Sequence, residues 1–114
     1  MSIVKSPSEH NRTIHYAHSA AVSTDDILLV NGRVLIAYAD LAADEEGMYF
    51  IIADEVEAPK AAVAIAAGDA AYWDNGASNF TNVVGTNTKC GMFRKAAVGG
   101  DANGNLRLDN TVNV

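Results

Sequence analysis

The stretch ILLVNGRVLIAYA, residues 27–39, decides the fold class of this chain. Two runs of aliphatic and β-branched residues flank the dipeptide Asn31-Gly32. Asn and Gly both tolerate a positive φ angle, which a type I′ turn requires at its two central residues. The stretch therefore predicts a tight antiparallel β-hairpin, and its nearly continuous apolar arms predict strands that are covered on both faces.

Short β-strand patterns continue along the rest of the chain. We expect strands at residues 13–17, 48–53, 70–73, 78–84, 89–98 and 106–112, with turn-forming residues between most of them. Residues 61–67 are rich in Ala, the best helix former, and favour one short helical turn. The expected fold class is mainly β: a small antiparallel β-barrel or sandwich with one short helical turn and an extended N-terminal arm.

The stretch PKAAVAIAAGDAAYWDNG, residues 59–76, is expected to shape the core. Gly68 and Asp69 are expected to reverse the chain, and Tyr72 and Trp73 should point to opposite faces of the next strand. Trp73 is the only tryptophan in a chain whose apolar residues are mostly small, so its burial matters to the core. The core and turn residues predicted from sequence are Asn31, Gly32, Gly68, Asp69, Tyr72 and Trp73.

The 114 residues carry a net charge of −6, and the charge is unevenly distributed. Residues 1–18 hold Lys5 and Arg12 against Glu9, whereas all other segments together are acidic. We therefore divide the chain into an N-terminal arm, residues 1–18, and a β-rich domain, residues 19–114. The acidic balance argues against nucleic acid as a partner, because phosphate neutralisation needs a basic face.

Seven acidic and no basic residues lie within residues 40–57. Charge runs of this kind are usually solvated, so a solvent-exposed loop and sheet edge is the favoured interpretation. A site for a cation or for a basic partner is the alternative.

No motif in the chain predicts an active site, a metal site or a cofactor. Cys90 is the only cysteine, and no histidine that could act as its base lies in the C-terminal 96 residues, so a buried apolar role is expected. His15 and His18 are three residues apart, which places them on opposite faces of a strand and disfavours zinc binding. Neither a GxGxxG nor a GxxxxGK[ST] phosphate loop is present.

One enzymatic or sugar-binding alternative stays open at this point. This alternative places acids such as Asp69, Asp74 or Glu57 around Trp73, because an exposed Trp beside paired carboxylates can stack a sugar ring. A small sugar-binding or hydrolytic β-barrel would use these residues. The structural interpretation is that Asp69 and Asp74 bend the backbone at glycine turns.

The N-terminal sequence MSIVKSPSEHNRT lacks the apolar run of a signal peptide, and no segment approaches the length of a membrane span. Synthesis in the cytoplasm and the lack of a membrane partner are the expectations that follow.

The order of several motifs resembles that of a family of small phage proteins. The motifs are Val30-Asn31-Gly32, Pro59-Lys60-Ala61, Gly68-Asp69, Tyr72-Trp73-Asp74 and Leu106-Arg107-Leu108-Asp109. Over residues 20–112 the chain resembles the DUF2190-type phage capsid cement, or head-decoration, proteins.

The resemblance implies a β-rich virion protein, made in the host cytoplasm, that binds the outside of an assembled capsid. It also implies a homotrimer at local three-fold positions that clamps neighbouring subunits of the major capsid protein, without catalysis. A tail or baseplate module with the same small fold is the runner-up. The arm residues expected to contact the shell are Ile3, Val4, Lys5, Arg12, Ile14 and Tyr16.

Overall fold

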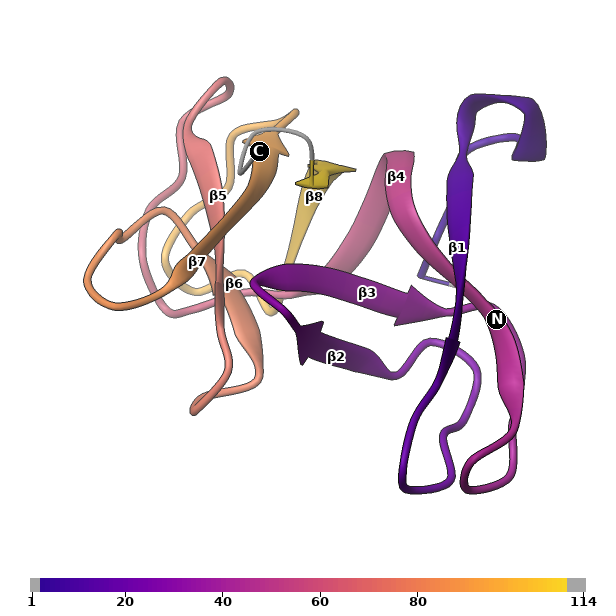
Figure 1. Cartoon of the computed structure of the whole chain (residues 1–114). Coiled ribbons are helices and arrows are strands. Elements are labelled where there is room, and N and C mark those ends of the chain that lie inside the picture. The colour runs from indigo at the N-terminus through magenta and orange to yellow at the C-terminus, as the bar shows by residue number, and fades with distance from the viewer. Residues whose placement is uncertain (1–2, 111–114) are drawn as a thin grey trace.

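The computed structural model describes residues 3–110, and it is mainly β, as the sequence predicted. All strand pairs between named elements are antiparallel, in the order β2-β3-β4-β8-β7-β5-β6, with β1 added to β4 (Figure 1). The sheet curls into a half-barrel, and a bridge between Lys60 and Phe80 brings the end of β4 back to β6. The elements are η1 (Ser8–His10), β1 (Arg12–Ala17), β2 (Ile27–Val30), β3 (Arg33–Ala37), β4 (Glu46–Pro59), β5 (Ala70–Asp74), β6 (Asn79–Thr81), β7 (Thr88–Phe93) and β8 (Asn103–Asp109).

The hairpin predicted at Asn31-Gly32 is confirmed as the β2–β3 pair. The φ angles of Asn31 and Gly32 are 52° and 76°, which is the left-handed pair that the turn requires. Strand β3 is buried on both faces from residue 34 to residue 37. The expectation that both arms are covered is wrong for β2, because β2 ends the sheet and leaves Leu29 38% exposed.

Strand β4 is the longest strand and the centre of the sheet. The sequence predicted it only as far as residue 53, but it continues to Pro59 after a register shift between Ala53 and Val56. One edge of β4 pairs with β3 and then β8, and the other edge pairs with β1. Beyond β1, the extended residues 3–5 follow the same edge, where Glu57 N donates to Ile3 O at 2.9 Å.

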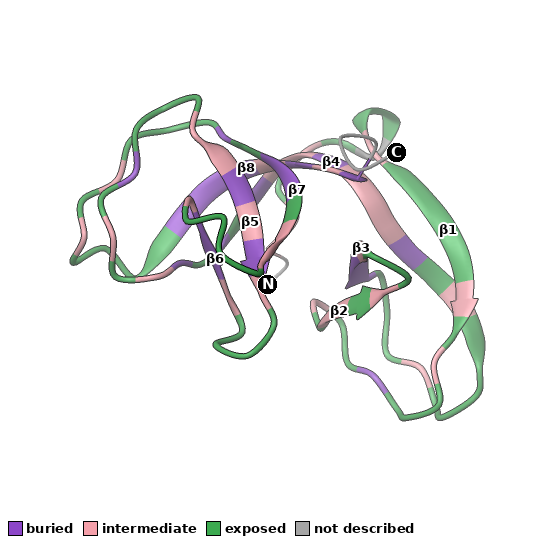
Figure 2. Ribbon diagram, turned by 60° about the vertical axis from the view of Figure 1, so that its left-hand side comes forward, coloured by how far each residue is buried: buried purple, intermediate pink, exposed green. Residues whose placement is uncertain are grey.

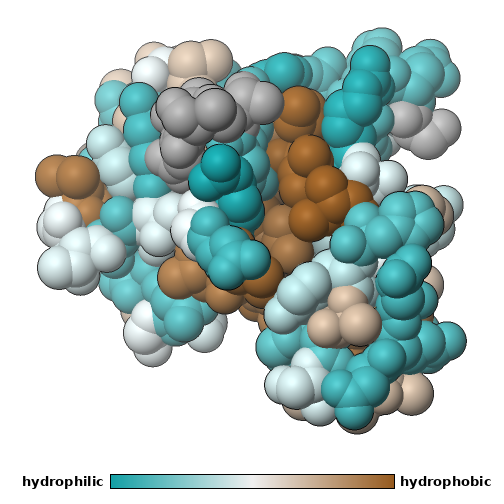
Figure 3. Space-filling view, viewed as in Figure 1, coloured by the Kyte–Doolittle hydropathy of each residue, from teal (hydrophilic) through white to brown (hydrophobic). Residues whose placement is uncertain are grey.

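Two hydrophobic clusters lie on opposite faces of the strands that they share. Figure 2 shows the buried residues concentrated on β3 and β8 and on parts of β4, β5 and β7. On the face shown in Figure 3, apolar surface gathers in the middle, and hydrophilic side chains cover the periphery. The half-barrel core contains Val34, Ile36, Ala53, Val56, Ala58, Ile65, Ala71, Trp73, Phe80, Cys90, Phe93, Leu106 and Leu108, and the smaller cluster contains Val22, Leu35, Ala37 and Tyr49.

The helical turn expected at residues 61–67 is wrong, because this segment is a loop. The buried Lys60 donates from Nζ to the carbonyl oxygens of Ala61 and Val63, at 3.0 and 2.9 Å. Ile65 forms a β-bridge with Ala97, so tertiary pairing overrides the helix propensity of alanine. The short helical turn that the described chain does contain is η1.

Several strand boundaries also differ from the prediction. Strands β6 and β7 are shorter than the expected residues 78–84 and 89–98, since each leads into a loop. Strand β8 begins at Asn103, and residues 111–112 of its expected range lie outside the described part of the chain.

Candidate interaction surface

The six arm residues predicted from sequence divide between the interior and the surface. Ile3 and Val4 pack against the half-barrel core, and Val4 forms a β-bridge with Val56. Tyr16 packs edge-on against the buried ring of Tyr49, with ring centroids 5.8 Å apart. These three side chains therefore hold the N-terminal segment against β4.

Lys5, Arg12 and Ile14 are exposed. The backbone N of Lys5 donates to Glu55 O at 2.8 Å, so the residue is fixed while its side chain faces solvent. Arg12 donates from Nη1 to the carbonyl oxygens of Glu9 and Asn11, at 3.3 and 2.9 Å. The structure thus presents two cationic side chains and one apolar side chain on a segment that Ile3, Val4 and Tyr16 anchor.

An exposed apolar patch that the sequence analysis missed lies beside β1. Tyr38 is 51% exposed and packs on Phe50 with ring centroids 5.4 Å apart, and Met48 is 38% exposed. Thr13 Oγ1 donates to Met48 Sδ at 3.8 Å across the β1–β4 pair. We call Thr13, Tyr38, Met48 and Phe50 the Tyr38–Met48 patch. Tyr, Phe and Met are enriched at protein interfaces, which gives this patch the composition of a binding surface.

The sequence did not predict this patch, because its residues come from β1, from β4 and from the end of β3. Tyr38 follows β3, and its backbone N donates to Met48 O at 3.2 Å. Only the register between β3 and β4 brings these side chains to one face, and that register is not visible in the local sequence.

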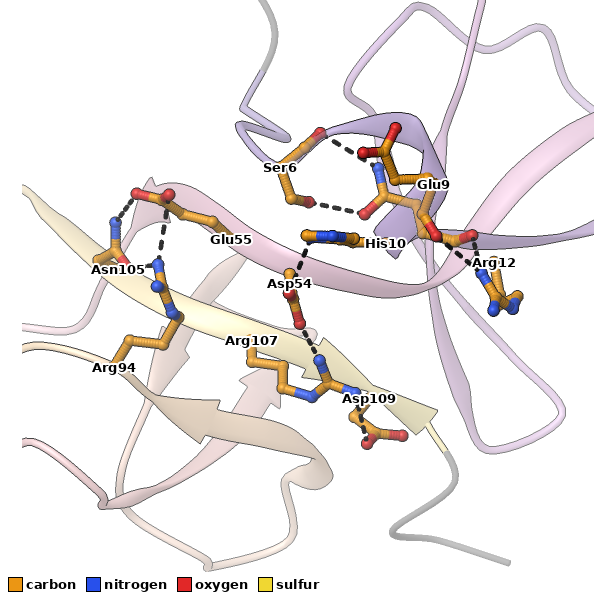
Figure 4. A network of polar contacts seen from close by, with 11 residues as sticks. Ser6, Glu9, His10, Arg12, Asp54, Glu55, Arg94, Asn105, Arg107 and Asp109 are labelled. Atoms are coloured by element: carbon orange, nitrogen blue, oxygen red, sulfur yellow. Dashed lines mark hydrogen bonds and ion pairs between the residues drawn. The ribbon is translucent and has the colours of Figure 1, made fainter.

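A polar network on the outer side of the sheet joins η1 to β4 and β8 (Figure 4). Asp54 accepts a hydrogen bond from Arg107 Nη1, and its other oxygen lies 3.3 Å from His10 Nδ1. Arg107 Nη2 lies 3.5 Å from Asp109 Oδ2. The guanidinium therefore bridges two carboxylates and links the N-terminal segment to the final strand.

A second part of the network is centred on Glu55. Asn105 Nδ2 donates to Glu55 Oε2 at 2.8 Å, and Arg94 Nη1 lies 3.3 Å from Glu55 Oε1. Arg94 also donates to Asn105 Oδ1 at 3.1 Å. The hydrogen bond from Asn105, followed by the positive charges of Arg94 and Lys95, lowers the pKa of Glu55.

The acidic run of residues 40–57 is thus only partly the solvated edge that was expected. Asp40 accepts from the backbone N and from Oγ1 of Thr24, at 2.7 and 3.0 Å, and these bonds lower the pKa of Asp40. Glu46 Oε2 lies 3.4 Å from His15 Nδ1 on β1. Cross-strand partners balance part of the charge, and the exposed turn before β4 keeps the remaining acids.

The turn residues of the Ala-rich stretch behave as predicted. Gly68 has a φ of 94°, and Asp69 Oδ2 accepts from Ala66 N at 2.9 Å. Asn82 Nδ2 donates to the same oxygen at 2.9 Å, and the bond from Ala66, followed by that from Asn82, lowers the pKa of Asp69. Asp74 Oδ1 accepts from the backbone N atoms of two residues of the following turn. Both carboxylates therefore shape turns.

Trp73 is part of the core and Tyr72 lies on the other face of β5, as expected. The indole of Trp73 is 4% exposed and packs on Phe80, with ring centroids 4.8 Å apart. Trp73 Nε1 donates to Asn75 Oδ1 at 3.0 Å. The indole face is thus occupied by core contacts, which contradicts the exposed Trp that the sugar-stacking alternative requires.

Cys90 is fully buried in the core, as expected for a small apolar residue. Burial raises the pKa of its thiol to about 12, so the thiolate that a nucleophile needs is disfavoured. His15 is exposed on β1, whereas His18 lies after β1 with its ring centroid 6.1 Å from that of Tyr16. Within residues 3–110, no group of three or more His, Cys, Asp or Glu side chains is placed to hold a metal ion. Nor does that part of the chain contain a helix long and apolar enough to cross a membrane.

Comparison with known protein families gives a match over most of the chain. A protein-family model described as phage cement protein matches residues 7–108, which include β1 and nearly all of β8. Searches of curated proteins and of solved structures found no match. The family description implies association with the phage capsid, and it fits a structural protein of the virion. The resemblance noted in the motif order is confirmed, and the chain belongs to the phage cement protein family.

Proposed function

We propose that this protein binds the outer surface of the phage head and stabilises contacts between neighbouring subunits of the major capsid protein. The observation that carries the proposal is the Tyr38–Met48 patch, which exposes Tyr and Met side chains beside the N-terminal segment. Side chains of this kind supply large buried areas at protein interfaces. Membership in the cement family supports the capsid as their partner.

In this proposal residues 1–18 contact the shell together with the patch. Lys5 and Arg12 supply the positive charge that most of the chain lacks, and Ile14 supplies apolar surface. The contacts of Ile3 and Val4 with the core keep the segment close to the patch. Both the arm and the patch then contribute to the contact with the shell: the arm lies along one edge of β4, and the patch lies on β4 itself and at the end of β3.

The protein acts on the capsid as a homotrimer in this proposal. A net charge of −6 per chain disfavours close approach of acidic surfaces, so the subunits associate away from the acidic turn before β4. Three linked copies bind a lattice with an avidity that one weak contact lacks. Size-exclusion chromatography with light scattering measures this directly, and a monomer at all concentrations contradicts the trimer.

Cosedimentation with capsids that lack the protein tests the binding function. The full chain is expected in the pellet, and the double variant Tyr38→Ala/Met48→Ala is expected in the supernatant. Val98→Ala is the matched control, because Val98 is 66% exposed but lies in the loop between β7 and β8. Bound capsids should also resist heating better than bare capsids. A full-length chain that stays in the supernatant contradicts the proposal.

A further inference from the structure

The outer edge of β1 carries free backbone groups at alternate residues. On β4, Met48 O accepts from Tyr38 N, so the backbone groups of Met48 face β3. Groups of successive residues in a strand face opposite edges, so the backbone of Tyr49 faces β1. Its register partner is Ile14. Ile14, and by the same alternation Tyr16, therefore direct their N–H and C=O groups toward β4.

The same alternation turns the backbone groups of Thr13, His15 and Ala17 away from β4. Within residues 3–110, β1 pairs with no strand except β4. Figure 2 shows β1 along the outer margin of the molecule, where no other element follows its free edge. In most proteins a Pro, a bulge or a covering loop prevents another strand from pairing with an edge of this length. Here the bulge is confined to the start of the strand, between Arg12 and Thr13.

We propose that an extended segment of the major capsid protein adds to this edge as an antiparallel strand; the proposal rests on the capsid-binding function proposed above. The outward groups of Thr13, His15 and Ala17 would form the ladder hydrogen bonds. Strand addition of this kind takes its affinity from the backbone and its specificity from alternate side chains. The register of the added strand is thus set by the side chains of β1.

The side chains around the edge specify the chemistry of the added strand. Ile14 is 36% exposed and Tyr16 is partly exposed, and both lie on the face that holds Tyr49. Residues of the partner that stand opposite them are therefore apolar. The exposed acids Asp44 and Glu45 lie in the turn that enters β4, beside the Ala17 end of β1, so this end of the added strand carries Lys or Arg.

Charge also decides between a capsid segment and a second copy of this chain as the occupant. A second copy would bring another net charge of −6 to the same edge. A basic strand neutralises the acids instead, and it lowers the repulsion between the copies on a lattice.

The test compares two substitutions at His15, both of which remove the imidazole and its contact with Glu46. His15→Pro also removes the outward N–H, at an edge position where proline leaves the β1–β4 ladder intact. His15→Thr keeps that N–H and the β-propensity. We expect His15→Thr to bind bare capsids within about twofold of the native affinity, the usual range for a surface change. His15→Pro should lose about tenfold, through a lost ladder bond and an unpaired partner carbonyl. Equal affinities of the two variants overturn the proposal.

Hydrogen exchange on the unmodified protein gives a second readout that does not depend on folding of the proline variant. The amides of Ile14 and Tyr16 should be protected with and without capsids, because they bond to β4. The amides of Thr13 and His15 should exchange quickly in the free protein and slowly on capsids. Binding without that protection overturns the strand addition and leaves the capsid-binding function intact.

Two other outcomes also decide the question. A native chain that fails to bind capsids overturns both proposals. Protection of Thr13 and His15 that rises with protein concentration, without capsids, assigns the edge to a second copy and overturns the capsid segment as its occupant.

Discussion

The side chain of Asn110 pairs with the backbone of Val34 as a strand residue would. Its Oδ1 accepts from Val34 N at 2.8 Å, and its Nδ2 donates to Val34 O at 2.7 Å. The same Nδ2 donates to Ile51 O at 2.9 Å. Because Asn110 is 3% exposed and follows β8, one amide joins the end of β8 to β3 and β4.

Asn110→Ala should therefore lower the free energy of unfolding by about 2–4 kcal/mol, since it leaves buried backbone groups of Val34 unpaired. Urea denaturation followed by circular dichroism measures the change. Asn103→Ala is the matched control, because Asn103 is an exposed asparagine on β8. Equal stability of the two variants would show that the amide clamp contributes nothing.

Gly32→Ala tests the turn that decides the fold. A Cβ atom at Gly32 meets nothing within 4 Å, so the substitution destabilises the fold only through the φ of 76° at this position. A non-glycine residue in the left-handed region costs about 1–2 kcal/mol, and the midpoint of urea unfolding should fall accordingly. Gly100→Ala, which also has open space around it but no positive φ, should leave the midpoint unchanged. A Gly32→Ala midpoint equal to that control contradicts the type I′ turn.

The Glu55 network predicts a stability change in mild acid. The pKa of Glu55 is lowered in the folded state from its ordinary value of 4.5, chiefly by the hydrogen bond from Asn105. The contribution of ionised Glu55 to the stability of the fold is thus fully present above pH 4.5. It is lost as the pH falls through the lowered pKa that Glu55 has in the folded state.

Glu55→Gln should flatten the stability curve in that window, and Glu57→Gln, at an exposed position on the same strand, should not. Thermal unfolding between pH 3 and pH 6, a window of about three units around the carboxyl range, measures both. If the stability of the native protein and that of Glu55→Gln depend on pH in the same way, ionised Glu55 does not stabilise the fold.

Trp73 provides a test of the core and of the sugar-binding alternative. With its indole 4% exposed, its fluorescence should be blue-shifted and resistant to iodide, and soluble sugars should not change it. Trp73→Ala should lower the free energy of unfolding by about 3–5 kcal/mol, through the lost burial and the cavity left behind. Quenching of the Trp73 fluorescence by sugars at low concentration would instead support the sugar-binding alternative.

The local sequence predicted the features that depend on backbone chemistry at one or two residues. Asn31-Gly32 specified its turn because few residues accept two positive φ angles in succession. The chain reversal at Gly68 and Asp69 also has a local cause. Gly68 adopts a positive φ, and the carboxylate of Asp69 accepts a hydrogen bond from Ala66 N. Trp73 faces the core and Tyr72 faces away from it, as the alternation of side chains along a strand predicts.

Features that depend on partners far along the chain were not predictable in this way. Asp54 and Glu55 lie beyond the strand predicted at residues 48–53, yet they belong to β4, where their side chains contact Arg107 and Asn105 of β8. The sequence predicted a helical turn at residues 61–67, but the segment is a loop in which Ile65 pairs with Ala97. The family resemblance supplied the association with the capsid, and the fold then showed which arm residues are exposed.

We propose that this protein lies on the outside of the phage head and reinforces the seams between its capsid subunits. A cryo-electron microscopy map of the mature head tests it most directly. We predict density for the half-barrel outside the shell at junctions between subunits, with β1 and the Tyr38–Met48 patch against the capsid surface. Bare junctions on the outer surface, or density for this chain only in the tail, would contradict the account.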